Sequence, residues 1–459
     1  MQTRADRFPI RNTQSVDSDS QIWNWAQNDR LGAKAQVKRP DDEQQLRALV
    51  AGHAGNIAIL GSRLSTGDLM HAENSNTLLL DPGALAGLLS STPQTVTFGG
   101  ATPLHQVYAT LTEMGRMLAA SPGVIALQTL AGAIATGTHG QGLRQGSIAD
   151  EVLHLRLIQA DGGVLELDRQ HPWFGAAQLA LGTLGVVTAV TLKTLPQGIF
   201  TCFKSATDDA ALESTLIEWN ETFPLSKAWW FPEDHLVHVW RARPATDDEA
   251  KAYRLNNGAT VSLSSGNDAM NTTVDRTLVH MQNDIQGAKG DKPFKTVERF
   301  KDFTDITGDI YQLYCRGIAT PQINIEIGIP LRRAGQVIEK IKQWYRDTHP
   351  HMHYPIILRC TGPSDAWLSP ASQEATCFFG FVVYYAADGT LSKDGVHFLD
   401  AVEKLLAQEG GRPHWGKYYD PALYHWHHLY PQWQQFRAVR AALDPTGKFA
   451  NAYTTALFG

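Results

Sequence analysis

The alternation of apolar and polar positions predicts a succession of short strands and helices between residues 35 and 195. Residues 39–55 match an amphipathic helix entered through Pro40, because Leu46, Leu49 and Val50 fall on one face. Short apolar runs bounded by turn residues predict strands within the segments 56–60, 76–81, 95–99, 151–167 and 181–195. This order is typical of an α+β domain with strand–helix–strand pieces.

From about residue 200 to residue 425 the pattern changes to strands whose faces alternate only in part. Strands are expected at residues 323–330, 355–361 and 376–385, and helices at residues 332–348 and 395–410. A β-sheet covered by helices, in a second domain, accounts for this order. A last helix within residues 430–445 is stopped by Pro445.

Composition narrows the class of protein. A length of 459 residues indicates more than one domain or a large domain with an insertion, and 43% hydrophobic residues suffice for a sizeable core. A net charge of −6 without a Lys/Arg-rich block argues against nucleic acid or an anionic membrane surface as the main partner. No apolar run of about 18 residues predicts a membrane-spanning helix, and no secretory signal is expected. Four singly spaced cysteines favour a reduced, cytoplasmic protein.

One stretch consists almost entirely of small residues: LAGAIATGTHGQG, residues 130–142. Small residues are needed where a backbone closely approaches a ligand or another backbone. Free N–H groups in such a turn suit a phosphate, so one hypothesis is a dinucleotide site and the other is a tight turn between packed helices. The glycine spacing is neither G-x-G-x-x-G nor G-x-x-x-x-G-K-[ST], so any dinucleotide here is held by another kind of fold.

Several motifs, in the expected order, resemble one family. The segments 58–68 (AILGSRLSTGD), 128–142 (QTLAGAIATGTHGQG) and 182–193 (GTLGVVTAVTLK) resemble the PCMH-type FAD-binding domain of the vanillyl-alcohol oxidase superfamily. The later motifs SDAWLSPA, RPHWGKYYDP and LDPTGKFANAY resemble its sugar-lactone and alditol oxidase branch. The likeness therefore covers nearly the whole chain.

This resemblance implies a fold and a reaction. A two-subdomain FAD-binding domain is expected at residues 1–197, with the C-terminal segment 430–459 returning to it. A substrate-binding cap with an antiparallel sheet covered by helices is expected at residues 198–429. The implied activity is oxidation of an alcohol group on a small molecule by hydride transfer to FAD.

The resemblance also assigns residues to the cofactor. Two glycine-rich turns with their flanks are expected at the diphosphate, ribityl chain and flavin, and the GTLG strand near the adenine. These residues are Gly61, Ser62, Arg63, Leu64, Ser65, Gly123, Ala131, Gly132, Thr136, Gly137, Thr138, His139, Gly140, Gly185 and Val186. His139 either faces the flavin or only hydrogen-bonds the backbone. Many relatives carry a histidine in the first turn that bonds to the flavin, whereas Leu64 stands there in this chain, so non-covalent FAD is expected.

The substrate side departs from the family pattern. Relatives have Glu-x-Arg in the strand of residues 355–361, whereas this chain has Ile357 and keeps Arg359. Three further positions that are polar in alditol oxidases are Val124, Gly380 and Val382. The substrate pocket is therefore expected to be less polar, roomier or both. Glu326 either replaces the missing acid or faces solvent, as strand glutamates commonly do.

Lys417, Arg359 and His414 remain as candidates for the chemistry. An alcohol that loses a hydride needs a proton acceptor, which a lysine of lowered pKa can supply, while an arginine stays charged and can only anchor. The resemblance puts Gly123 beside the flavin, where a small residue lets oxygen in. Oxygen is therefore the expected electron acceptor, with a quinone or cytochrome as the alternative.

Two other functions stay open. The GSRLSTGD turn also resembles decaprenylphosphoryl-ribose oxidases, and the missing glutamate is compatible with a flavin-binding protein that has lost oxidation chemistry. Two histidine groups lack carboxylates or cysteines at useful spacing: His349, His351 and His353, and His425, His427 and His428. No metal is therefore expected, and the second group is expected to pack near the flavin edge.

Overall fold

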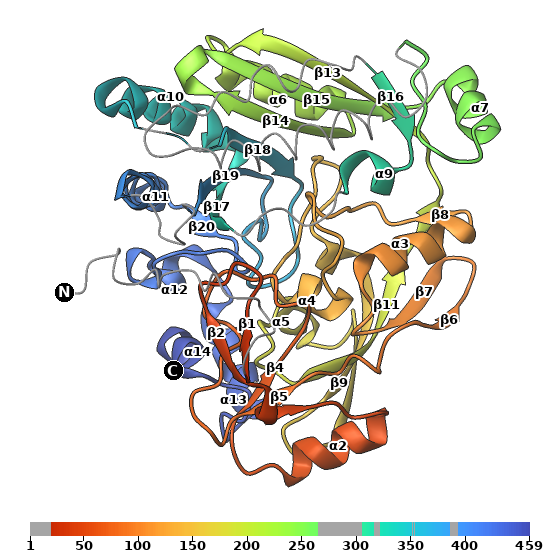
Figure 1. The fold of residues 1–459 in the computed structure, drawn as a ribbon, viewed down its shortest axis with the longest axis vertical. Helices are drawn as coiled ribbons and strands as arrows, with labels where there is room; N and C mark the ends of the chain where they lie inside the picture. The colour runs from red at the N-terminus through yellow and green to blue at the C-terminus, as the bar shows by residue number, and fades with distance from the viewer. Residues whose placement is uncertain (1–19, 265–304, 316–321, 351, 353, 386–392) are drawn as a thin grey trace.

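The computed structural model describes residues 20–264, 305–315, 322–350, 352, 354–385 and 393–459. Helices and strands are mixed throughout this part of the chain, and every pairing in the two largest sheets is antiparallel. Figure 1 shows the N-terminal elements, red to yellow, below a later unit in green to blue. The α+β class expected from the sequence is confirmed.

The N-terminal unit is built around two sheets. The antiparallel sheet has the order β10-β9-β11-β7-β6, with β6 (Leu88–Ser91), β7 (Thr95–Gly99), β9 (Val152–Ile158), β10 (Val164–Asp168) and β11 (Val186–Lys193). The parallel sheet has the order β3-β5-β4, with β3 (Val37–Lys38), β4 (Ile57–Ile59) and β5 (Leu78–Leu80). Helix α2 (Glu43–Gly52) follows Asp42, whose side chain accepts the N–H of Gln45, and it buries Leu46 and Val50 as its pattern predicts.

Shorter elements complete this unit, and the end of the chain returns to it. They are β1 (Gln21–Trp23), β2 (Arg30–Ala33), β8 (Arg116–Met117), β12 (Leu195–Pro196), α3 (Leu104–Glu113), α4 (Leu130–Ala135), α5 (Phe174–Ala177), and the 3-10 helices η1 (Lys34–Gln36) and η2 (Ile148–Glu151). The C-terminal helices α13 (Trp433–Leu443) and α14 (Ala452–Phe458) contribute Phe436 and Phe458 to the buried cluster that contains Phe98 of β7.

The later unit contains an eight-stranded sheet of order β16-β13-β15-β14-β18-β19-β17-β20. Its strands are β13 (Phe200–Asp208), β14 (Leu225–Phe231), β15 (Leu236–Pro244), β16 (Asp305–Gly308), β17 (Gln322–Pro330), β18 (Ile356–Thr361), β19 (Thr376–Tyr384) and β20 (Arg412–Pro413). The sequence pattern does not reveal β14, because all seven of its residues are buried and no alternation marks it.

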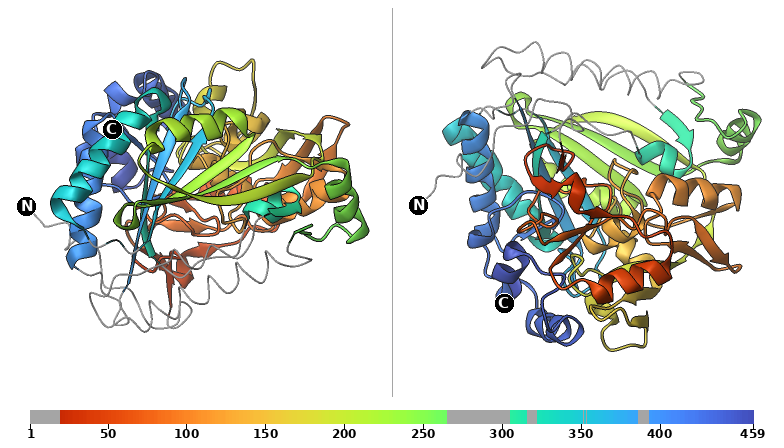
Figure 2. Two further views of the ribbon diagram at one scale, coloured as in Figure 1. Left: turned by 90° about the horizontal axis from the view of Figure 1, so that it is seen from above. Right: turned by 60° about the horizontal axis from the view of Figure 1, so that its bottom comes forward.

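In the described part of the chain, three helices cover one face of this sheet, while α9 (Ile310–Tyr314) packs on the opposite face of β13, β14 and β15. The covering helices α6 (Leu212–Thr222), α10 (Leu331–Thr348) and α11 (Lys393–Gln408) share one buried cluster with the strands. Figure 2 shows α10 and α11, teal and blue, side by side along one flank. The remaining elements are α7 (Asp247–Leu255), α12 (Trp426–Leu429), η3 (Pro232–Asp234) and η5 (Pro421–Leu423). No helix within the described ranges is long and apolar enough to cross a membrane.

Candidate active site

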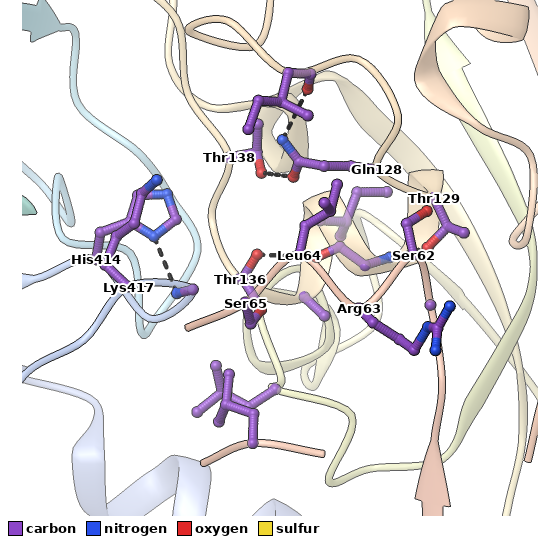
Figure 3. Close-up of a pocket in the computed structure, with 18 of the residues that line it drawn as sticks. Ser62, Arg63, Leu64, Ser65, Gln128, Thr129, Thr136, Thr138, His414 and Lys417 are labelled. Carbon is purple, nitrogen blue, oxygen red and sulfur yellow. Dashed lines mark hydrogen bonds between the residues drawn. The ribbon is translucent and has the colours of Figure 1, made fainter. Parts of the chain in front are cut away.

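A cavity of about 330 Å³ lies between the N-terminal unit and the open face of the eight-stranded sheet. One wall comes from the segments 59–65, 123–139 and 177–187. The opposite wall comes from β14, β17, β18 and β19, together with His414 and Lys417. Figure 3 shows these last two residues on one side of the cavity and the first glycine-rich turn across from them. The five substrate-side candidates all line it: Val124, Glu326, Ile357, Gly380 and Val382.

The first glycine-rich turn follows β4, and all of its candidate residues line the cavity: Gly61, Ser62, Arg63, Leu64 and Ser65. Gly61 has no room for a side chain, because a Cβ atom there would lie 2.8 Å from Thr129 Oγ1. Arg63 has a φ of 58°, a left-handed conformation that sharpens the turn. The Ser62 hydroxyl donates a hydrogen bond to the Leu127 carbonyl and so ties this turn to the second one.

The small-residue stretch contains both a cavity wall and a tight turn. Its cavity-lining members are Ala131, Gly132, Thr136, Thr138 and His139. Gly137 and Gly140, expected at the cofactor, do not line the cavity. Gly137 has a φ of +74°, and a Cβ atom on Gly140 would lie 2.4 Å from the Ser121 carbonyl oxygen. These two glycines therefore shape the backbone that holds the lining residues in place.

One candidate near the GTLG strand needs correction. Gly185 and Val187 line the cavity, whereas Val186 does not: it is fully buried in a cluster with Leu46 and Val50 of α2. Successive residues of a strand point to opposite faces, so only one of two neighbouring valines can reach the cavity. The sequence motif alone does not say which one.

The centre of the cavity holds a carboxylate on β17. Every second residue of this strand is isoleucine, and these isoleucines pack against the covering helices: Ile323, Ile325, Ile327 and Ile329. The residues between them turn to the opposite face, where Gln322, Asn324 and Glu326 line the cavity. Glu326 is 3% exposed, so the alternative of a solvent-facing glutamate is wrong.

Glu326 lies within a cluster of basic groups. Its Oε1 atom forms an ion pair with Arg359 Nη2 and lies 3.6 Å from His139 Nε2. Burial acts to raise the pKa of Glu326, but the charge of Arg359, followed by His139, His414 and Lys417, outweighs burial and holds that pKa well below its ordinary value. The carboxylate is therefore ionised at neutral pH.

The two histidines of the cluster are neutral at pH 7. Burial, opposed by Glu326, lowers the pKa of His414 to about 4 and holds the pKa of His139 well below its ordinary value. His139 Nδ1 lies 3.2 Å from the Gly140 carbonyl oxygen, which can only accept, so the proton is on Nδ1 and Nε2 carries a lone pair. His414 Nδ1 accepts the N–H of Gly416, so its proton is on Nε2.

The remaining basic groups are Lys417 and Arg359. Burial lowers the pKa of Lys417, with Glu326 opposing and Arg359 reinforcing the shift. Arg359 lies against Gly123: a Cβ atom on that glycine would lie 1.4 Å from Arg359 Nη1. The gap expected beside Gly123 is therefore filled by a guanidinium group, and Gly123 is small because Arg359 passes there.

The histidine groups have different surroundings. His425, His427 and His428 are exposed on and before α12 and do not line the cavity, contrary to expectation. His349 ends α10, while His351 and His353 lie outside the described residues.

One buried group has a geometry that could hold a metal ion. Donor atoms of His139, Glu326 and His414 lie within 4.8 Å of one another. Arg359 already supplies positive charge there, and the His414 Nε2 atom carries a proton where a metal would need a lone pair, so this cluster is better suited to hydrogen bonding.

Comparison with known proteins identifies the family. Residues 190–457, more than half of the chain, match the D-arabinono-1,4-lactone oxidase family, and residues 34–168 match the FAD binding domain family. The chain belongs to the D-arabinono-1,4-lactone oxidase family. It is accordingly an FAD-dependent oxidoreductase that acts on a CH–OH group, as the sequence motifs predicted.

Curated relatives extend over most of the chain. L-gulono-1,4-lactone dehydrogenase of Mycobacterium tuberculosis is 26% identical over 96% of this chain and 100% of its own length. Alditol oxidase of a Streptomyces species is 27% identical, with coverages of 94% and 97%. L-gulonolactone oxidase of Bos taurus is 26% identical, with coverages of 73% and 75%.

Solved structures support the fold. Cholesterol oxidase of Brevibacterium sterolicum superposes with a TM-score of 0.74 at 16% identity, covering 98% of this chain and 100% of that one. At this identity the likeness concerns the architecture alone.

Several cavity residues were not found from the sequence: Lys227, Trp229, Gln322, Asn324, Tyr354 and Tyr384. For Gln322 and Asn324 the signal was present, because polar residues and isoleucines alternate strictly in QINIEI. Such alternation does not say whether the polar face meets water or a second domain. The other four residues lie on strands or loops, and the sequence does not show which elements pack against them.

Proposed function

We propose that this protein oxidises an alcohol group of a small molecule bound between non-covalently held FAD and the face formed by β17, β18 and β19. The Glu326–Arg359 ion pair is the observation on which the proposal rests. A buried ion pair is costly, and a merely structural cavity wall has no need of one. This argues against a flavin-binding protein that has lost its chemistry.

The cavity fits FAD in its N-terminal half. Gly61 admits no side chain, Arg63 sharpens the turn, and the second turn and Gly185 complete a wall of small residues. These residues would hold the diphosphate, ribityl chain and adenine ends. Leu64 lines the cavity and carries no nucleophile, which supports non-covalent binding.

When bound, FAD supplies the acceptor for the hydride that leaves the alcohol carbon. The ionised Glu326 accepts the hydrogen bond of the reacting hydroxyl and orients it. Arg359 holds the carboxylate in place and charged. Lys417 Nζ in its neutral form, which the lowered pKa favours, takes the hydroxyl proton as the carbonyl product forms. Glu326 itself is too weak a base for that step, since its own pKa is depressed.

We further propose an FAD-binding domain at residues 1–197, a substrate-binding cap at residues 198–429 and a C-terminal segment, residues 430–459, that returns to the FAD-binding domain.

We also propose oxygen as the electron acceptor. Similar proteins include named oxidases and one named dehydrogenase, so the acceptor needs its own test. Mixing photoreduced enzyme with air-saturated buffer gives the answer: reoxidation within seconds supports oxygen, and reoxidation over minutes refutes it.

A substrate screen tests the activity directly. Alditols, aldonolactones and less polar alcohols are mixed anaerobically with the holoenzyme, and loss of the visible flavin absorbance is followed. Bleaching by at least one alcohol is expected. A flavin that no alcohol bleaches, in enzyme that dithionite still reduces, would contradict the proposal and favour the flavin-binding alternative.

A further inference from the structure

A row of polar side chains continues along β17 beyond Glu326. Asn324 and Gln322 lie two and four residues away on the same face, so the row extends about 14 Å from Glu326. Gln322 and Asn324 are each 8% exposed, and both line the cavity. The polar surface of the site is therefore a stripe along one strand that reaches well past the ion pair.

The far end of this stripe has an unsatisfied hydrogen-bonding group. Gln322 Oε1 is buried and has no hydrogen-bond partner among the described residues. Asn324 Oδ1 accepts a long hydrogen bond of 3.4 Å from Thr66 Oγ1. Buried side-chain oxygens are normally paired, so an unpaired one on a cavity wall indicates a ligand group that donates to it.

The neighbouring strand forms an apolar stripe in register with the polar one. Tyr384 lies opposite Gln322, and Val382 lies opposite Asn324. Tyr354 adds a second ring, 6.3 Å from that of Tyr384 and tilted at 64° to it. A ligand lying over both strands thus meets amide groups on one side and hydrocarbon and aromatic surface on the other.

We infer that the substrate extends from its reacting alcohol into a second hydroxylated ring, as in a glycosylated alcohol. The hydroxyl edge of that ring hydrogen-bonds Gln322 and Asn324, and its carbon–hydrogen face packs on Val382 and Tyr384. A hexitol or a single lactone ring held at Glu326 is too short to reach Gln322. This inference rests on the proposed function, because Glu326 fixes the position of the reacting end.

Sorbitol and its glucoside maltitol test the inference, with the dissociation constant and the limiting rate of anaerobic flavin reduction measured for each on the holoenzyme. We expect maltitol to bind at least 10-fold more tightly than sorbitol. Gln322→Leu should remove most of this preference, because it deletes one buried hydrogen bond to maltitol. Gln343→Leu, an exposed change on α10, is the control and should leave both sugars unchanged.

Two further measurements keep the test decisive. Val382→Ser should reduce the affinity for maltitol relative to that for sorbitol, even if Gln322→Leu does not fold. Equal affinities in the wild type, or a preference that survives both changes, would overturn the inference while sorbitol still bleaches the flavin. If neither sugar, nor any alcohol of the screen, bleaches a flavin whose spectrum maltitol still perturbs, the proposed oxidation fails and the recognition of a second ring stands.

Discussion

Glu326 and Ile357 lie opposite the same residue, Gly380, from the two strands that flank β19. Glu326 therefore lies about 10 Å from Ile357, two strands across the sheet. Arg359 of β18 pairs with Glu326 across β19. The carboxylate partner of Arg359 is thus supplied by β17 and not by Ile357, which lies two positions before Arg359 on its own strand.

Gly380 should tolerate little bulk. A Cβ atom there would lie 3.3 Å from the Ile357 Cβ. Because Glu326 lies opposite Gly380 on the other neighbouring strand, we expect a longer side chain to crowd the ion pair. Gly380→Leu should lower the anaerobic flavin reduction rate on the order of 100-fold or more, while Gly380→Ala should cost much less. Unchanged reduction in Gly380→Leu, at normal FAD content, would show that the route across β19 is not needed.

Gly123→Ala should impair reduction of the flavin by substrate and not only its reaction with oxygen. The new methyl group overlaps Arg359 Nη1, so the guanidinium that pairs with Glu326 must shift. Stopped-flow measurement of the two half-reactions separates these effects. Gly52→Ala is the matched control, because nothing lies within 4 Å of a Cβ atom there. Slowed reoxidation with normal reduction would instead support the oxygen gap expected from the sequence.

FAD should leave the protein on denaturation. Leu64 offers no atom for a covalent bond to the flavin, so acid precipitation is expected to release all yellow colour into the supernatant. Colour retained in the washed pellet would contradict this expectation.

Flavin reduction should become faster with rising pH through the pKa of Lys417. The neutral amine is the form that accepts a proton, and burial lowers that pKa below its ordinary value, so the rise should occur below the usual lysine range. Lys417→Ala should cost on the order of 100-fold or more and flatten the profile. A profile with the same midpoint in Lys417→Ala would assign the titration to another group.

The sequence predicted the architecture better than the details of the site. Motif order located both glycine-rich turns and the basic residues Arg359, His414 and Lys417, all of which line one cavity. Glu326 stayed ambiguous because alternation along β17 defines a polar face without saying what covers it. The contact between Gly123 and Arg359 could not be predicted, because the two residues lie more than two hundred positions apart in the chain. Contacts between separate units depend on strand register, which local patterns do not contain.

The rate of anaerobic flavin reduction in Glu326→Gln tests the central claim most directly. The amide keeps the shape but not the charge that orients the alcohol and pairs with Arg359, so a loss on the order of 100-fold or more is expected at saturating substrate. Glu339→Gln, on the exposed face of α10, is the matched control and should leave the rate unchanged. Both variants are to be compared at equal FAD content and with a measured melting temperature. A Glu326→Gln enzyme that binds FAD and reduces it at a near-normal rate would contradict the account.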